Sequence, residues 1–243
     1  NLISDSAVSY EPISYNYFSD SDIMTASVSH SVSSSNYGTY FDNEGNLKSS
    51  SVNSGDTMNL DGSFSGKKFI LNKQLNVVGT STNSMRDCTV VLLSEASGST
   101  VSHLNIVNNG VDKQGVFIVG ATNCNVHDNK ITCSGVSSFP IALNPGSHHN
   151  IISNNNIIID STKYVIGIYV AMADNTIIMD NNIKLTAGNI AYGVYNIYSH
   201  DFKVFMSTIW TANTKIIRNF IDAKGSIVCL INSIEAKNTL VDS

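Results

Sequence analysis

The sequence has few charged side chains. Asp, Glu, Lys and Arg make up 14% of its 243 residues, and 14 basic against 19 acidic residues leave a formal net charge of −5. Clustered basic side chains bind nucleic acids and anionic membranes, so this balance argues against both as partners. Since Ser, Thr and Asn must then solvate most of the surface, the composition favours an extracellular β-structure.

Long apolar runs, frequent prolines and acceptor sites for N-linked glycans are also missing. No run approaches about 18 consecutive apolar residues, so we expect no membrane span. The chain has only three prolines, and its segments rich in Ile and Val can fill a long core. This composition excludes a disordered protein. Although Asn is abundant, no Asn-x-Ser/Thr triplet occurs. The chain opens at Asn1 without Met or a charged leader, and we expect a processed or excised piece.

The few cysteines and histidines do not form a metal motif. The spacing of Cys88, Cys124, Cys133 and Cys229 fits neither a zinc site nor a dense disulfide scaffold. Unpaired Cys is often buried, so we predict free thiols in the core, with a disulfide as the alternative. The adjacent pair His148-His149 would point to opposite faces of a strand. We therefore predict no metal site and no cofactor.

A repeat with a period of about 25 residues runs through the middle and the end of the chain. It is clearest in STVSHLNI (99–106), CNVHDNKI (124–131), NIISNNNI (150–157), TIIMDNNI (176–183) and TKIIRNFI (214–221). Each segment carries two aliphatic residues five positions apart. The first of each pair is Val101, Val126, Ile152, Ile178 or Ile216, with Val241 as a truncated sixth, and the second is Ile106, Ile131, Ile157, Ile183 or Ile221.

Such a period is typical of coils that stack through parallel strands about 4.8 Å apart. One coil cannot bury its own aliphatic side chains, but a stack turns them into continuous interior columns. The sequence therefore predicts an all-β fold, a single-stranded right-handed parallel β-helix (a solenoid) with coils of about 25 residues.

Asn recurs at two positions of the coil. Three residues after the first aliphatic residue it appears as Asn129, Asn155, Asn181 and Asn219, with Leu104 as the exception. Three residues before, it appears as Asn123, Asn175, Asn213 and Asn238, replaced by Gly98 and His149 elsewhere. We predict bends in which Asn adopts the left-handed conformation, with amides bonded from coil to coil.

The repeat does not cover the whole chain evenly. Residues 1–35 are Ser-rich, and we interpret them as a linker or N-terminal segment, with an extended tail against the first coil as the alternative. Residues 36–243 are predicted as the β-helix with an N-terminal cap. The step from Ile178 to Ile216 is longer than the others and predicts an insertion near 199–211, with a register slip of half a coil as the alternative. The last coil shows no polar cap, so we expect further coils or domains in the full protein.

The insertion is the predicted contact region, because insertions in solenoids usually lie on one face, which is often the binding face. Its candidate ligand-binding residues are His200, Asp201, Phe202, Phe205 and Trp210, the only Trp of the chain. Several tyrosines gather towards the same end of the chain, namely Tyr169, Tyr192, Tyr195 and Tyr198. We interpret them as packing under a flap, with stacking on sugar rings as the alternative.

Asp128, Asp180 and Arg218 form an alternative enzyme site. They share one predicted corner column. At the strand spacing the two carboxylates lie roughly 9.6 Å apart, which is at the upper end of the carboxylate separations found in inverting glycosidases. A solvated corner needs polar residues in any case. Because the chain also lacks the paired Asp, Gly-His-Gly and Arg-x-Lys motifs of polygalacturonases, we assign no catalytic residue.

The run SNYGTYFDNEGNLKSSSVNSGDTMNLDGSFSGKKFILNKQLNVVGT, together with the Asn-rich coils, resembles the adhesin-like surface proteins of methanogenic archaea, a family with pectin-lyase-like β-helices. The resemblance covers roughly residues 36–243. It implies export, attachment to the cell envelope and contact with other cells or surfaces, and it carries over no catalytic residue.

Our leading hypothesis is a non-enzymatic extracellular cell-surface protein that contacts a host or neighbouring cell surface, including its glycans. A carbohydrate-active β-helix enzyme, a polysaccharide lyase or hydrolase, is the first alternative. A structural stalk without a ligand is the second.

Overall fold

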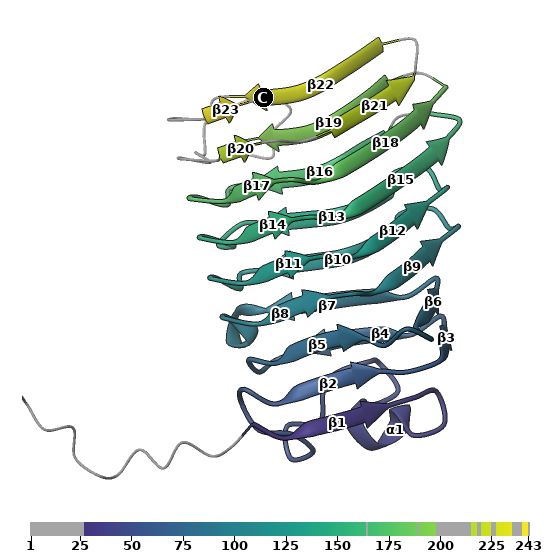
Figure 1. The fold of residues 1–243 in the computed structure, drawn as a ribbon, viewed down its shortest axis with the longest axis vertical. Coiled ribbons are helices and arrows are strands. Elements are labelled where there is room, and N and C mark those ends of the chain that lie inside the picture. The colour runs from purple at the N-terminus through teal and green to yellow at the C-terminus, as the bar shows by residue number, and fades with distance from the viewer. Residues whose placement is uncertain are drawn as a thin grey trace, which may run out of the picture.

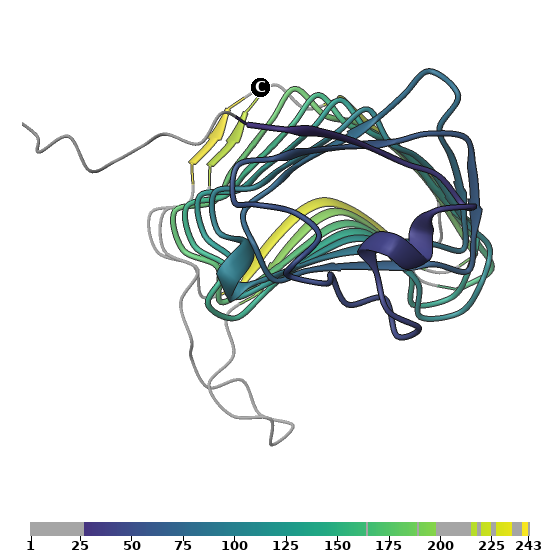
Figure 2. The ribbon, with the colours of Figure 1, turned by 90° about the horizontal axis from the view of Figure 1, so that it is seen from below.

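The chain winds into a parallel β-solenoid whose coils stack along one long axis (Figure 1). The computed structural model describes residues 27–163, 165–188 and 190–197, together with four later strands whose side chains are not considered. Three parallel sheets run along the stack and enclose the core, as the view along the axis shows (Figure 2). The predicted fold class, an all-β parallel β-helix, is confirmed, and its turns lie about 26 residues apart.

Sheet A contains nine strands and begins at the N-terminal end of the stack. In order along the sheet they are β1 (Ser29–Val32), β2 (Thr57–Leu60), β5 (Asn76–Gly79), β8 (Thr100–Ser102), β11 (Asn125–His127), β14 (Ile151–Ser153), β17 (Ile177–Met179), β20 (Lys215–Ile217) and β23 (Leu240–Asp242).

Sheets B and C contain seven strands each. Sheet B consists of β3 (Ser63–Ser65), β6 (Ser84–Arg86), β9 (Asn105–Asn108), β12 (Lys130–Cys133), β15 (Asn156–Ser161), β18 (Asn182–Ala187) and β21 (Phe220–Lys224). Sheet C consists of β4 (Lys68–Leu71), β7 (Thr89–Leu93), β10 (Gln114–Val119), β13 (Phe139–Asn144), β16 (Val165–Ala171), β19 (Ile190–Ile197) and β22 (Ile227–Ile234). Two short helices, α1 (Tyr37–Tyr40) and the 3-10 helix η1 (Ser94–Ala96), complete the described elements.

The predicted aliphatic columns are confirmed by the strand register. In sheet A, Val126 pairs with Val101 and Ile152, and the column continues through Ile178 and Ile216 to Val241. In sheet B the column runs through Ile106, Ile131, Ile157, Ile183 and Ile221. The members of both columns up to Ile183 are fully buried. The stack therefore forms the core, because each coil needs its neighbours to remove its aliphatic side chains from water.

The corner between sheets A and B corrects one prediction about Asn. Asn129, Asn155 and Asn181 are buried and do not have a positive φ. The left-handed residue is the one before each of these asparagines, and before Leu104 in the preceding coil. Those residues are His103, Asp128, Asn154 and Asp180, with φ between 53° and 58°. At the other predicted position, Gly98, Asn123, His149 and Asn175 have positive φ, as expected.

The buried asparagines form the predicted ladder. Asn129 Nδ2 donates to Asn155 Oδ1 at 3.0 Å, and Asn155 Nδ2 donates to Asn181 Oδ1 at 2.9 Å. Asn155 Oδ1 also accepts the backbone N–H of Asn129, one coil below, at 3.1 Å. In the same way Asn181 Oδ1 accepts the backbone N–H of Asn155 at 3.0 Å. The ladder thus satisfies the polar backbone of a buried corner.

The N-terminal end of the stack is closed by the segment between β1 and β2. Tyr37, Phe41, Leu47 and Val52 are buried there against the first coils. Phe69 of β4 meets both Tyr37 and Phe41 edge-on, at ring-centroid distances of 5.4 Å and 5.2 Å. Strand β1 pairs in parallel with β2, so residues 29–32 of the Ser-rich segment belong to sheet A.

The long step of the repeat has its extra residues between β19 and β20. Strand β19 pairs with β16 through Tyr169 and Tyr195, and β20 pairs with β17 through Ile178 and Ile216. Residues 198–214 therefore join β19 to β20, where only residues 172–176 join β16 to β17. The extra chain leaves at the corner from sheet C to sheet A.

The described cysteines agree with the prediction of core thiols. Cys88, Cys124 and Cys133 are free and buried. The side chain of Cys229 lies outside the described residues. Within the described part of the chain, α1 and η1 are both far too short to cross a membrane, and no membrane-spanning helix is found.

Candidate functional site

The predicted contact residues of the insertion cannot be assigned a place in the structure. His200, Asp201, Phe202, Phe205 and Trp210 lie outside the described residues, as does Arg218 of the alternative enzyme site. The insertion as a binding region therefore stays a prediction.

Asp128 and Asp180 occupy equivalent corners two coils apart, each as the left-handed residue of its turn. The side chain of Asp128 is 43% exposed, and its Oδ2 atom lies 2.7 Å from His127 Nδ1. A shallow groove at this corner is lined by Asp128 but not by Asp180. Both residues thus have a conformational role in the turn, and the enzyme hypothesis stays a prediction.

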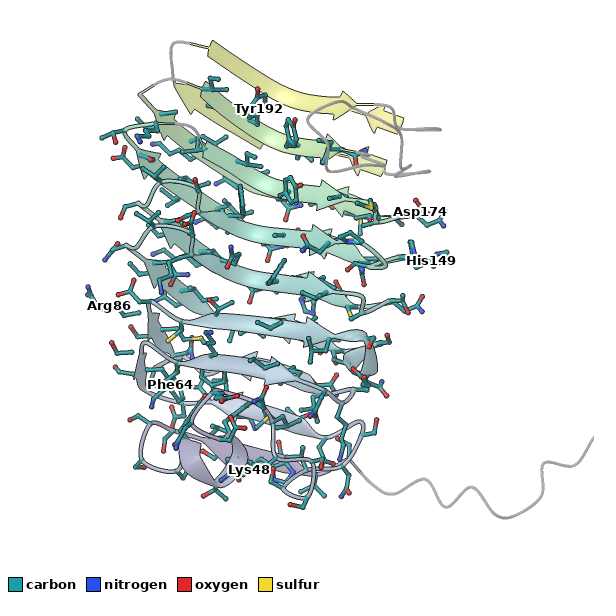
Figure 3. The ribbon with its side chains drawn as sticks, turned by 180° about the vertical axis from the view of Figure 1, so that it is seen from behind. Lys48, Phe64, Arg86, His149, Asp174 and Tyr192 are labelled. Atoms are coloured by element: carbon teal, nitrogen blue, oxygen red, sulfur yellow. The ribbon has the colours of Figure 1, made fainter. Side chains whose placement is uncertain are left out.

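His148 and His149 lie in the turn between β13 and β14 and not on a strand, so the prediction that they point to opposite faces of a strand is wrong, and the two histidines have different roles. His148 Nδ1 accepts the backbone N–H of Asp174 at 3.0 Å, and His149 is a left-handed corner residue. His149 and Asp174 lie at the same corner of neighbouring coils (Figure 3). Among the residues that the structure describes, no group of three His, Cys, Asp or Glu side chains could hold a metal ion.

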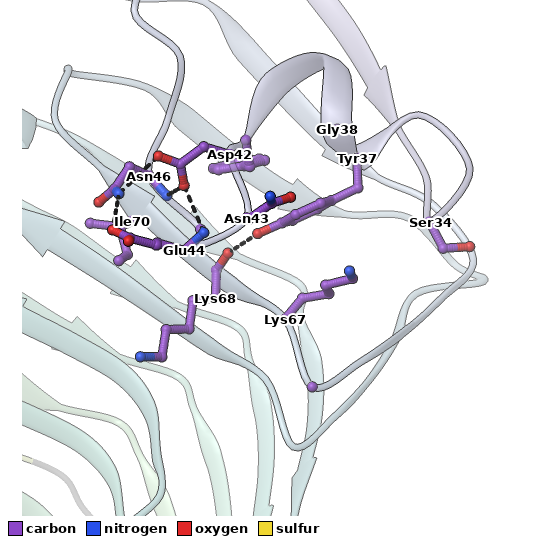
Figure 4. A pocket seen from close by; sticks show the side chains of 13 residues that line it. Ser34, Tyr37, Gly38, Asp42, Asn43, Glu44, Asn46, Lys67, Lys68 and Ile70 are labelled. Carbon is purple, nitrogen blue, oxygen red and sulfur yellow. Dashed lines mark hydrogen bonds between the residues drawn. The ribbon is translucent and has the colours of Figure 1, made fainter.

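A groove of about 620 Å³ lies at the N-terminal cap between the turn 42–46 and residues 66–68 (Figure 4). The Asn46 side chain donates to Asp42 Oδ2 at 3.0 Å and lowers the pKa of Asp42, as do the backbone N–H groups of Asn46 and Glu44, which donate to Oδ1. Tyr37 donates its hydroxyl to the carbonyl of Lys68, and Lys67 Nζ lies 4.8 Å from the centre of the Tyr37 ring. Since these groups hold the cap onto β4, the groove is a consequence of cap docking.

Sheet C carries a column of aromatic side chains on its outer face. The rings of Phe139 and Tyr169 stack with centroids 5.3 Å apart, and those of Tyr169 and Tyr195 stack at 6.1 Å with planes 8° apart. Tyr192 meets Tyr195 at 4.9 Å with its ring turned by 63°. These rings, called the aromatic column below, consist of Phe139, Tyr169, Tyr192 and Tyr195. Tyr192 marks their position towards the C-terminal end of the stack (Figure 3).

The column is partly exposed and is supported by the core beneath it. The strand residues that flank Tyr169 and Tyr195, such as Ile168, Val170 and Val194, are fully buried in the core. Burial raises the pKa of Tyr169 and of Tyr195, and a neighbouring tyrosine raises each pKa further. Among the described residues, no group bonds to the phenol oxygens of these two side chains. The column therefore offers partly exposed rings and two neutral hydroxyls on a sheet that is backed by the core.

Sequence patterns located part of this column. The tyrosines were expected near one another, but Phe139 was not, because the register pairs Tyr169 with Ala142 and Phe139 meets the Tyr169 ring diagonally. Its only sequence sign is a bulky aromatic residue at an outward position of a strand, next to Pro140. Comparison of the chain with protein-family models, with curated proteins and with solved structures gives no match.

Proposed function

We propose that this chain is a non-enzymatic extracellular contact module that binds glycans through the aromatic column of sheet C. The single observation that carries the proposal is the row of partly exposed rings on three successive strands of a parallel sheet, with Tyr169 and Tyr195 paired in register. Aromatic rings bury the apolar C–H faces of sugars while their hydroxyls bond to sugar hydroxyls. The rings repeat with the coils, so a glycan chain that runs along the solenoid axis meets several of them.

The resemblance to adhesin-like surface proteins of methanogenic archaea supports the same function. An adhesin of this kind would stand on the cell surface and touch a host or neighbouring cell. The low charge and the polar Ser, Thr and Asn surface suit that position. Labelling of intact source cells by antibodies against the purified chain tests the location, and label that appears only after lysis contradicts it.

A glycan array probed with the purified chain tests the binding function. We expect binding to at least one glycan, with affinity reduced by about tenfold or more in the double variant Tyr169→Ser/Tyr195→Ser, because two ring contacts are lost. The matched control is the double variant Lys184→Ser/Thr186→Ser, which changes two exposed side chains on the sheet B strand of the same coil as Tyr195.

The same glycans, incubated with the chain, separate a contact module from an enzyme. We expect neither new reducing ends nor unsaturated sugar products. Product formation would overturn the non-enzymatic part of the proposal, and binding that survives in the tyrosine double variant would overturn the aromatic column as the contact site. Circular dichroism of each variant ensures that a loss of binding is not a loss of the fold.

A further inference from the structure

One corner between sheets A and B is wider than the others. Four residues, 80–83, join β5 to β6, whereas two residues join the corresponding strands in each of the next four coils. The extra residues form a wall beside the corners of the two following coils. This second break in the period lies entirely within the described residues.

The wall is held in place by its own hydrogen bonds. The Thr80 hydroxyl donates to Asp61 Oδ1 at 2.8 Å, and the Thr82 hydroxyl donates to the same oxygen. Asn83 is buried, and it donates from Nδ2 to the carbonyl of Leu60 at 3.2 Å and accepts the Asn105 N–H at 2.9 Å. The loop is therefore a fixed part of the surface.

Gly79 allows this wall to start where it does. A Cβ atom on Gly79 would lie 2.2 Å from the carbonyl oxygen of His103, so only glycine lets β5 pass the corner of the next coil. The close approach brings the wall against the coil that carries His103.

A groove of about 430 Å³ lies between the wall and the corners of the next two coils. Its polar side chains come from three successive coils and include Ser81, His103, Asn105, Asp128 and Lys130. Two steps at the strand spacing span about 10 Å, which is the length of a disaccharide.

The groove combines one free cation with one carboxylate that already has a partner. Lys130 is exposed, and none of the ion pairs among the described residues involves it. The Asp128 carboxylate lies 2.7 Å from His127 Nδ1, and the His127 ring is 6.2 Å from that of His103, edge to face. A ligand in the groove thus finds an ammonium donor, an acceptor carboxylate, the His103 imidazole and neutral amide and hydroxyl groups.

From this arrangement we propose that the corner groove is a second binding site, specific for a saccharide unit that carries a carboxylate. The ligand carboxylate binds Lys130, and its ring hydroxyls donate to Asp128 and bond to Asn105 and Ser81. A sulfate ion has no hydroxyl to offer the Asp128 carboxylate, which repels it. A neutral sugar leaves the Lys130 charge without a partner. The groove therefore favours a hydroxylated monocarboxylate.

Titration calorimetry with defined oligosaccharides tests this site. The carboxylated probes are sialyllactose and a glucuronosyl-glucose disaccharide, which distinguish the two common sources of a sugar carboxylate, and the neutral probes are lactose and cellobiose. We expect at least one carboxylated probe to bind about tenfold more tightly than its neutral counterpart, the size of a charge-assisted contact. We expect Lys130→Gln to remove that preference.

Two further variants make the result specific. Lys184→Gln changes another exposed lysine of sheet B and should leave the preference intact. Asp128→Asn keeps a residue that tolerates the left-handed turn, removes the charge and should weaken binding of the carboxylated probe. The proposal is overturned if neutral and carboxylated probes bind equally, or if no probe binds at 10 mM (about 3 kcal/mol of binding free energy). It is also overturned if Lys130→Gln does not change the preference, or if inorganic sulfate binds as tightly as the saccharide.

This site is separate from the aromatic column, and the two proposals fail separately. Binding that depends on Lys130 but not on Tyr169 and Tyr195 supports the corner groove and contradicts the aromatic column. Binding that depends on the tyrosines alone does the reverse.

Discussion

Three consecutive asparagines, Asn154, Asn155 and Asn156, have three different roles at one corner, and their replacement by Ala should separate these roles. Asn154 is exposed and left-handed, with φ of 53°. Asn155 is buried and bonds to the coils above and below. Asn156 begins β15 with its side chain directed outward. The three residues are of the same type and adjacent in the chain, and only the structure assigns a separate role to each.

The largest loss is expected for Asn155→Ala. Its amide accepts the backbone N–H of Asn129 at 3.1 Å and donates to the carbonyl of Val126 at 2.9 Å. Without the amide, both buried backbone groups lose this partner, at about 1–3 kcal/mol each, so we expect a loss of about 3 kcal/mol in the free energy of unfolding. For a chain of this size that corresponds to a fall of about 6–12 °C in Tm.

The neighbouring variants set the scale. Asn154→Ala should lose about 1 kcal/mol, because Ala adopts the left-handed conformation less readily, and Asn154→Gly should restore it. Asn156→Ala should change stability by less than about 0.5 kcal/mol. Thermal and urea unfolding followed by circular dichroism measures all four proteins. If Asn155→Ala is no more destabilising than Asn156→Ala, the ladder does not hold the corner and our account of it is wrong.

Three further predictions concern pH, backbone packing and thiol chemistry. Burial by itself would raise the pKa of Asp56, but hydrogen bonds from Asn53, Val28 and His30 lower it to about 2, below the usual 3.8. The stabilisation by Asp56 is thus present above pH 4 and lost as pH falls towards 2. The difference in urea midpoint between the wild type and Asp56→Asn should therefore shrink over that range. A constant difference would contradict this prediction. Gly79→Ala should destabilise by about 2–3 kcal/mol through its clash with the next coil, while Gly38→Ala, which has open space, should not. Burial raises the pKa of Cys133 to about 12, so the thiol of the native protein should not react with iodoacetamide until the protein is unfolded in denaturant. Peptide mapping measures this labelling, and rapid labelling of native Cys133 would refute its burial.

The repeat of aliphatic residues was enough to predict the fold and much of its register. Parallel coils place each residue directly against the one a full period away, so an interior column must appear in the sequence as a periodic aliphatic residue. The columns from Val101 to Val241 and from Ile106 to Ile221 were predicted for that reason. The earlier coils were not, because Thr57 pairs with Asn76 across a step shorter than the later period, and the corner after Gly79 is longer.

Only the tertiary structure decided which corner residue bends and which one bonds. Asp128 and Asn129 are both polar and adjacent, and either suits a turn by composition. The direction of each side chain depends on where two strands end against their neighbours in the stack, and this turned the buried amide inward and left the carboxylate at the surface. For the same reason the stacking of Phe139 on Tyr169 and the presence of Ser81 and Lys130 in one groove came from the stacked coils. Contacts across coils depend on loop lengths that periodicity does not encode.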